Sequence, residues 1–166
     1  AAVPGDAAFA NAVATHGLVR EDMHTGSVAH FGVVVWPALL AAASLRSDPV
    51  TGRELLAAGA IGYEVGGRVG RAMMRPELAR LFRPTGLYGP LAAATATGLL
   101  LGLDAGRLAS AMAFGINAAA GFHEWPNAGG ADMFFHAGFA AQNGLRAARL
   151  AEAGAFGSPT VLEGPA

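Results

Sequence analysis

Residues 20–32, REDMHTGSVAHFG, concentrate titratable side chains in a chain otherwise rich in alanine, leucine, valine and glycine. They include two adjacent acids, Glu21 and Asp22, and two histidines, His24 and His30. An imidazole titrates near pH ~6.5, so it can take up and return protons at neutral pH. The stretch therefore predicts acid/base chemistry in a loop.

Three further segments carry polar side chains that can bind or orient a ligand. They are FRPTGLYG (82–89), the loop 122–132, and MFFHAGFAAQNG (133–144). Each adjoins the expected start of a helix, where free backbone amides favour anions. Arg83 can hold a carboxylate through two parallel hydrogen bonds, but its pKa above ~12 prevents it from acting as a base. Together these segments indicate a site for an anion.

Each candidate also has a structural interpretation. Asp22 can cap a loop, His24 can be solvated, and His136 can be a buried histidine bonded to a backbone carbonyl. The loop around His123 and Glu124 is either a lid or a plain connection. A metal held by Asp22, His24 and His30 is a further alternative, but no familiar zinc pattern is present, and we predict neither a metal nor a cofactor.

Helix signals along the chain predict the elements that must position these groups. TGRE (51–54) is a capping box, Asp6 and Asp104 are expected helix caps, and glycines follow several expected helix ends. Gly62, Gly66 and Gly70 share one helix face, where a second helix can approach closely. No strand-like alternation competes. We expect an all-α, compact bundle of about six helices, near residues 7–16, 33–46, 52–74, 86–101, 105–120 and 135–153.

The composition restricts the class of protein. The 166 residues fit one domain, 53% of them are hydrophobic, and mean hydropathy is +0.40. A net charge of −1 without a basic cluster argues against nucleic acid, and the absence of cysteine excludes disulfides. The longest apolar stretches, 31–45 and 87–103, each contain proline and are shorter than the ~20 residues a spanning helix needs. We therefore expect no membrane partner, and no signal peptide is evident. We predict a cytoplasmic protein.

The chain resembles the 2-methylcitrate dehydratase (MmgE/PrpD) family, which includes cis-aconitate decarboxylase and iminodisuccinate epimerase. The resemblance rests on five segments in the family's order: REDMHTGSVAH, GRELLAAGAIGYEVGGRVG, FRPTGLYGPLAAATATGLLLGLD, FFHAGFAAQNGLRAARLAEAG and VLEG. It implies an all-helical domain that normally accompanies a smaller α/β domain. Residues 1–166 are then one domain of a larger two-domain protein, or a shortened relative.

The resemblance also implies a chemistry and a set of residues. Family members act on small carboxylates, and the expected step is proton abstraction next to a carboxylate. Glu21 and Asp22 match the family's acidic pair, and His30 matches its active-site histidine. Arg83 replaces a common histidine in a His-Pro-Thr-Gly-like motif, and Met133 replaces a common lysine three residues before His136. The implied catalytic residues are His30 as general base, Asp22 orienting a histidine, and His24. The implied substrate-binding residues are Arg83, Thr85, Met133 and His136.

These two replacements leave the function open between two classes. One is a dehydratase, epimerase or decarboxylase domain, which is a lyase or isomerase. In that case we expect one cleft to contain His30, Arg83 and the start of segment 133–144. Asp22 and His24 would lie at its edge. Its substrate would carry fewer carboxylates than a tricarboxylate and place an apolar portion against Met133, unless Met133 fills a gap in the core. The other is a non-catalytic dimerisation or scaffold module. In both cases we expect a homodimer, because the chain is too apolar to bury every apolar stripe.

Overall fold

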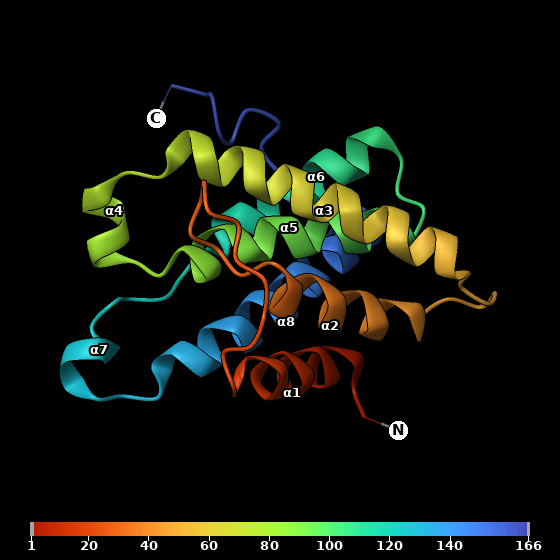
Figure 1. Ribbon diagram of the computed structural model, residues 1–166. Coiled ribbons are helices and arrows are strands. Elements are labelled where there is room, and N and C mark those ends of the chain that lie inside the picture. Colours follow the sequence, from red (N-terminus) through yellow and green to blue (C-terminus); the bar gives the residue numbers. More distant parts are fainter. Residues whose placement is uncertain (1, 166) are drawn as a thin grey trace.

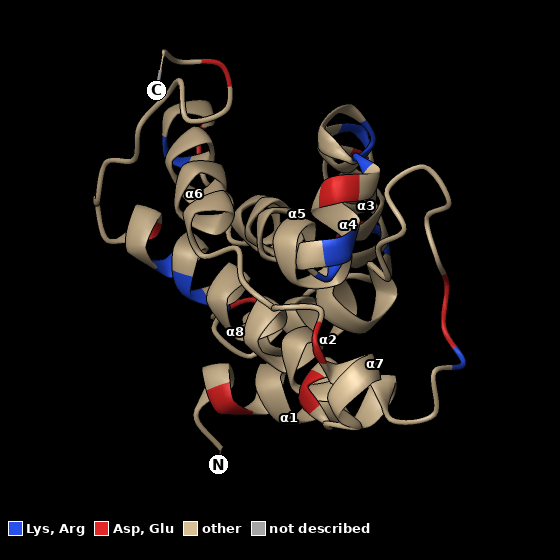
Figure 2. Ribbon diagram, turned by 90° about the vertical axis from the view of Figure 1, so that its left-hand side faces the viewer, with Lys and Arg blue, Asp and Glu red and all other residues tan. Residues whose placement is uncertain are grey.

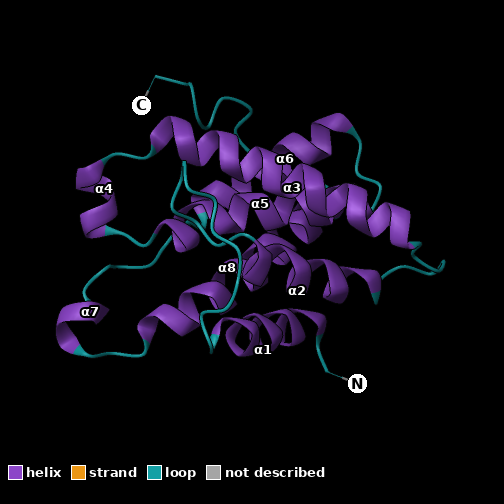
Figure 3. Ribbon diagram, in the orientation of Figure 1, coloured by secondary structure: helices purple, strands orange, loops and turns teal. Residues whose placement is uncertain are grey.

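The computed structural model describes residues 2–165, and within that range the chain forms eight helices and no strand (Figures 1 and 3). The predicted all-α fold is confirmed. The helices are α1 (Pro4–His16), α2 (Gly32–Ala43), α3 (Gly52–Met73), α4 (Pro76–Leu81), α5 (Pro84–Leu100), α6 (Ala105–Asn117), α7 (Trp125–Ala128) and α8 (Asp132–Glu152).

The six expected helices are present, and two short ones were not predicted. The six-residue α4 and the four-residue α7 both have proline in their first turn, where a missing amide hydrogen costs little. The prediction that Asp6 caps the first helix is wrong, because Pro4 already begins α1. Asp6 instead lies in the first turn and accepts a hydrogen bond from Gln142 on α8.

Two other predicted helix starts are confirmed in detail. The Thr51 hydroxyl accepts a hydrogen bond from the Glu54 amide at 3.2 Å, and the Thr51 amide donates to the Glu54 carboxylate at 2.8 Å. The Asp104 carboxylate accepts from the Arg107 amide at 2.9 Å and starts α6. Both arrangements satisfy backbone donors that the first helical turn leaves free.

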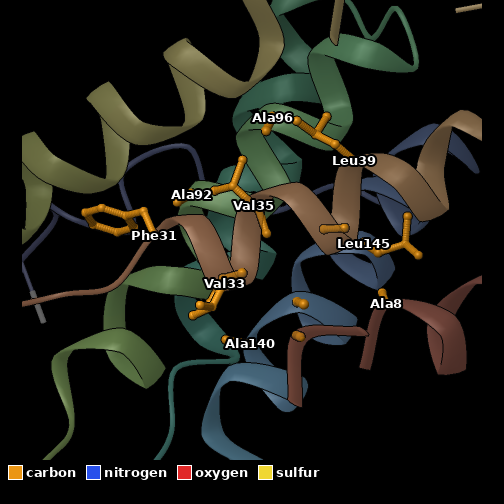
Figure 4. Packing of buried hydrophobic residues seen from close by; sticks show 14 of the residues in the cluster. Ala8, Phe31, Val33, Val35, Leu39, Ala92, Ala96, Ala140 and Leu145 are labelled. Carbon is orange, nitrogen blue, oxygen red and sulfur yellow. The ribbon is translucent and has the colours of Figure 1, made fainter. Parts of the chain in front are cut away.

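Helix α5 is the central element and packs against α2, α3, α6 and α8 (Figure 1). It carries no charged residue, and in Figure 2 the ribbon segments coloured for charged residues belong to the surrounding helices and loops. Helix α2 adds Val33, Val35 and Leu39 to the same core, beside Ala92 and Ala96 of α5 (Figure 4). Packing in the core therefore holds α5, including its first turn, in a fixed position.

The predicted close approach at the glycine face of α3 is confirmed. Gly62, Gly66 and Gly70 are buried, and a Cβ at Gly62 would lie 2.8 Å from the Ala92 carbonyl oxygen of α5. At Gly66 it would lie 2.6 Å from the Phe31 ring. Glycine is thus required for α3 to rest on both α5 and the segment leading into α2. Among the described residues, no helix combines the length and apolarity that crossing a bilayer requires.

Candidate functional site

The start of α5 is joined directly to the loop that precedes α2. Thr85, in the first turn of α5, is fully buried, and its hydroxyl accepts a hydrogen bond from the His30 amide at 3.1 Å. Arg83 immediately precedes α5, so this single contact places the Arg83 and His30 segments side by side. Thr85 therefore positions the backbone of the site.

A chain of hydrogen bonds runs from Arg83 to Glu21 through His16, the last residue of α1. The Nη2 of Arg83 lies 2.8 Å from the Nε2 of His16, and the Nδ1 of His16 lies 2.6 Å from the Oε1 of Glu21. Because a guanidinium can only donate, the Nε2 of His16 must be the acceptor. The remaining ring proton is then on Nδ1, and it is donated to Glu21.

The surroundings of His16 favour this neutral form. Its side chain is fully buried. Burial lowers the pKa of His16 and the positive charge of Arg83 lowers it further, against an opposing effect of Glu21. The geometry and the electrostatics therefore agree on one tautomer, with the proton on Nδ1.

Within residues 2–165, His30 has partners for one ring nitrogen and none for the other. Its Nδ1 lies 2.9 Å from the carbonyl oxygen of Asp22 and 3.4 Å from the Oε1 of Glu21. Both are acceptors, so Nδ1 of the neutral ring carries the hydrogen and Nε2 is unprotonated. The side chain is 18% exposed. The Nε2 of His30 is therefore available to accept a proton.

The guanidinium of Arg83 is buried but only partly paired. The residue is 8% exposed, and its Nε has no hydrogen-bond partner among residues 2–165. Burial lowers the pKa of Arg83, opposed by the charge of Glu21. The Trp125 ring lies 5.6 Å from the guanidinium carbon, within the range of a cation–π contact. Buried polar groups are normally satisfied, so the unpaired Nε fits a group that binds an anion.

His136 and Trp125 both line a pocket of about 640 Å³, whose lining is largely aromatic and alanine. Phe82, Phe122 and Phe139 contribute to that lining. The Nδ1 of His136 is buried without a partner in the described range, and burial lowers the pKa of His136, followed by the charge of Arg83. The pocket lining does not include His30, Arg83, Thr85 or Met133. His30 and Arg83 are thus linked through His16, whereas His136 is the one predicted site residue that lines this pocket.

Asp22 has a different place from the one expected of a group that orients a histidine. Its carboxylate accepts the amide hydrogen of Gly32 at 3.0 Å and so caps α2. The Tyr63 hydroxyl is its neighbour, and burial together with the Asp22 charge raises the pKa of Tyr63 to about 12. Only the backbone carbonyl of Asp22 contacts His30. Glu21, rather than Asp22, supplies the carboxylate that faces the two histidines His16 and His30.

His24 and Met133 also lie apart from this cluster. The Nδ1 of His24 lies 2.8 Å from the Ser27 hydroxyl, and its ring faces a separate pocket of about 660 Å³ beside Arg68 and Arg71. Met133 is 8% exposed and lines none of the three pockets described. Its burial matches the packing interpretation. Within residues 2–165, no three His, Asp or Glu side chains are grouped so as to hold a metal ion.

Sequence inspection missed two members of the site. The sequence predicts His16 only as the end of the helix 7–16, and a basic residue in a last helical turn is common. Trp125 lies in the loop 122–132, and no pattern there predicts a contact with Arg83. The one available signal for His16 was its separation of five residues from Glu21, and a loop between them can produce many geometries.

The sequence of the MmgE/PrpD N-terminal domain matches residues 2–166, and the chain belongs to this family. It is 34% identical to a cis-aconitate decarboxylase-like protein, oryM, of Aspergillus oryzae, over 96% of the chain and 34% of that protein. It is 31% identical to the cis-aconitate decarboxylase of Aspergillus terreus, over 96% of the chain and 33% of that protein. The human cis-aconitate decarboxylase is 34% identical, with the same coverage. The chain spans about a third of the length of these curated relatives.

Proposed function

We propose that this domain provides the acid/base residues of a lyase or isomerase that acts on a small carboxylate. The Nε2 of His30 removes a proton from the carbon next to the carboxylate, and Arg83 binds that carboxylate. As the C–H bond breaks, negative charge develops on the carboxylate, and a fixed guanidinium in a water-poor site stabilises it.

One observation supports this proposal most directly. A buried, partly unpaired guanidinium and an unprotonated imidazole nitrogen belong to one chain of contacts, in which Arg83 bonds His16, His16 bonds Glu21, and Glu21 lies 3.4 Å from the ring of His30. The relatives agree with it, since the proteins named cis-aconitate decarboxylase act on a carboxylate. Elimination and epimerisation begin with removal of a proton from the carbon next to the carboxylate. Decarboxylation ends with the return of a proton to a carbanion.

We propose further that the substrate carries fewer carboxylates than a tricarboxylate. Arg83 is the cation that the cluster offers, because Met133 supplies no charge. The apolar wall is the aromatic pocket beside Trp125 rather than Met133, which is buried elsewhere. Glu124 and Asp132 also line that pocket and would repel additional carboxylates.

Binding of acetate, succinate and tricarballylate to the chain tests the proposal, with thermal shift and NMR titration as the measurements. A ligand of the folded state raises Tm. Arg83→Ala should weaken binding by about 1.5–3 kcal/mol, the typical contribution of a hydrogen bond to a charged group. Arg71→Ala, which removes an exposed arginine, is the matched control.

Two results would reject the proposed function. One is the absence of binding by the wild type to all three probes. The other is equal binding by wild type and by folded Arg83→Ala, which would favour the non-catalytic module. Arg83→Lys provides a second variant, which keeps the charge while removing the two-pronged geometry.

We also propose that the domain forms a homodimer. Leu18, Phe122 and Phe156 are 76%, 73% and 80% exposed, and large exposed apolar side chains are typical of interfaces when they gather in patches. Light scattering at micromolar concentration should give twice the mass of the chain. A monomer under those conditions would contradict this proposal.

A further inference from the structure

His16 connects the anion-binding arginine to the only carboxylate that faces both histidines of the described cluster. Its Nε2 accepts from Arg83 at 2.8 Å, and its Nδ1 donates to Glu21 at 2.6 Å. Both ring nitrogens are therefore used. No other residue of the described cluster contacts the anchor and the acid at once.

The two hydrogen bonds of His16 respond differently when its ring takes up a proton. A guanidinium has no acceptor, so the bond to Arg83 exists only while Nε2 lacks a hydrogen. Adding a proton to Nε2 converts this hydrogen bond into the contact of two cations. The bond to Glu21 survives protonation and becomes an ion pair.

The groups around His16 come from every segment packed against it. Glu21 and His30 face it from the loop 17–31, and Arg83 faces it from the start of α5. From α8, the Phe134 ring centroid lies 6.0 Å from that of His16. His136, also on α8, repels a protonated His16, and this repulsion is one of the causes that lower the pKa of His136. Three of these neighbours are cationic or can become so, and one is an anion. Adding a proton to His16 is thus opposed by burial and by most of the charges it faces.

We propose that His16 is a positioning residue whose neutral form fixes the guanidinium of Arg83 for carboxylate binding and whose protonation releases it. This inference rests on the proposed function, because it concerns the same carboxylate. His16 itself does not touch the substrate. It acts by holding Arg83 on one side and by orienting Glu21, the neighbour of His30, on the other.

The carboxylate anchor, Arg83, and the base, His30, are thereby coupled through His16 and Glu21. Glu21 lies 2.6 Å from the Nδ1 of His16 and 3.4 Å from the Nδ1 of His30. A shift of His16 therefore moves the carboxylate against His30 as well. Binding of the carboxylate should weaken only as the pH falls well below 6.5, because the lowered pKa of His16 keeps its ring neutral, and Arg83 held, until then.

Three variants separate the two hydrogen bonds of His16. In His16→Asn the side-chain amide lies near the position of Nδ1, so a donor to Glu21 is retained and the acceptor for Arg83 is lost. In His16→Gln the amide reaches the position of Nε2, so an acceptor for Arg83 is retained without a titratable group. Gln142→Ala is the control, because it removes an exposed hydrogen bond to Asp6 at the opposite end of α1 from His16.

The experiment combines ¹⁵N NMR of the histidine rings with titration by succinate. We expect His16 in the wild type to carry its proton on Nδ1, with an Nε2 resonance that moves in Arg83→Ala. Succinate should bind His16→Asn roughly tenfold more weakly than wild type, as for the loss of one hydrogen bond to a charged group. His16→Gln should keep most of the affinity but lose its decline at low pH. Gln142→Ala should behave as wild type.

The outcomes distinguish this inference from the proposed function. A His16 protonated on Nε2, or an Nε2 resonance indifferent to Arg83→Ala, overturns the positioning role whether or not succinate binds. Equal affinity and equal pH dependence in wild type, His16→Asn and His16→Gln overturn it while carboxylate binding stands. If the spectra show the expected tautomer and the wild type binds no succinate, the proposed function fails, and the positioning role fails with it.

Discussion

Replacing Gly62 by alanine should destabilise the domain although alanine is the better helix former. Gly62 lies inside α3, and a Cβ there would be 2.8 Å from the Ala92 carbonyl oxygen and 2.8 Å from the Ala96 Cβ of α5. Neither neighbour is the end of a flexible side chain, so the helices themselves must separate. Overpacking of this kind costs about 1–3 kcal/mol, whereas the gain in helix propensity is only about 1 kcal/mol. Because both contacts are with rigid atoms, the cost should lie in the upper half of that range, and the expected net loss is about 1–2 kcal/mol.

Gly106→Ala is the matched control, because the nearest atom to its Cβ would be an Asp104 oxygen at an ordinary 3.5 Å. That variant should be more stable than wild type by about 0.4–1 kcal/mol, because alanine lowers the conformational entropy of the unfolded chain. Urea unfolding of both variants measures the difference. The reasoning would be refuted if Gly62→Ala were as stable as wild type, or if both alanine variants changed stability in the same direction.

Three further predictions concern caps, pH and charge. Thr51→Ala should lose about 1 kcal/mol in urea unfolding, because the capping box with Glu54 disappears; unchanged stability would contradict it. The folded state lowers the pKa values of His16 and His136, so the unfolded chain takes up protons that the folded chain refuses, and stability should fall as pH drops below ~6.5. Unfolding curves at pH 7.5 and 5.5 measure this loss, which His16→Gln should reduce. Met133→Lys should lower Tm by burying an unpaired ammonium without shifting preference toward tricarballylate; such a shift would return Met133 to the binding site.

The helices were predictable because their signals are local. The capping box at Thr51, the cap at Asp104 and the glycine face of α3 each depend on residues within a few positions of one another. Helices α4 and α7 have six and four residues, too short for a periodic pattern and too short to be stable alone. Their formation depends on the packing of the surrounding chain, which the local sequence does not express.

The candidate site was predictable only as a set of segments. The loop 21–30 and the start of α5 were both identified, but the pairings within them depend on the path of the loop. Val28 adopts a φ of 56°, a left-handed conformation that is rare for a β-branched residue, and no sequence pattern signals it. That path places the carboxylate of Glu21 toward the histidines and turns that of Asp22 toward α2.

The buried charge of Arg83 accounts for the two side chains connected to it, neutral His16 and, beyond it, the acid Glu21. A guanidinium is charged at every physiological pH, so its burial requires a counter-charge nearby. Glu21 is that counter-charge, and His16 transmits the contact as a neutral relay, leaving the set without net charge. Because Arg83 cannot take up a proton, we propose His30 rather than Arg83 as the group that transfers it. In this proposal the carboxylate anchor, Arg83, and the base, His30, are separate residues, and His16 and Glu21 connect them.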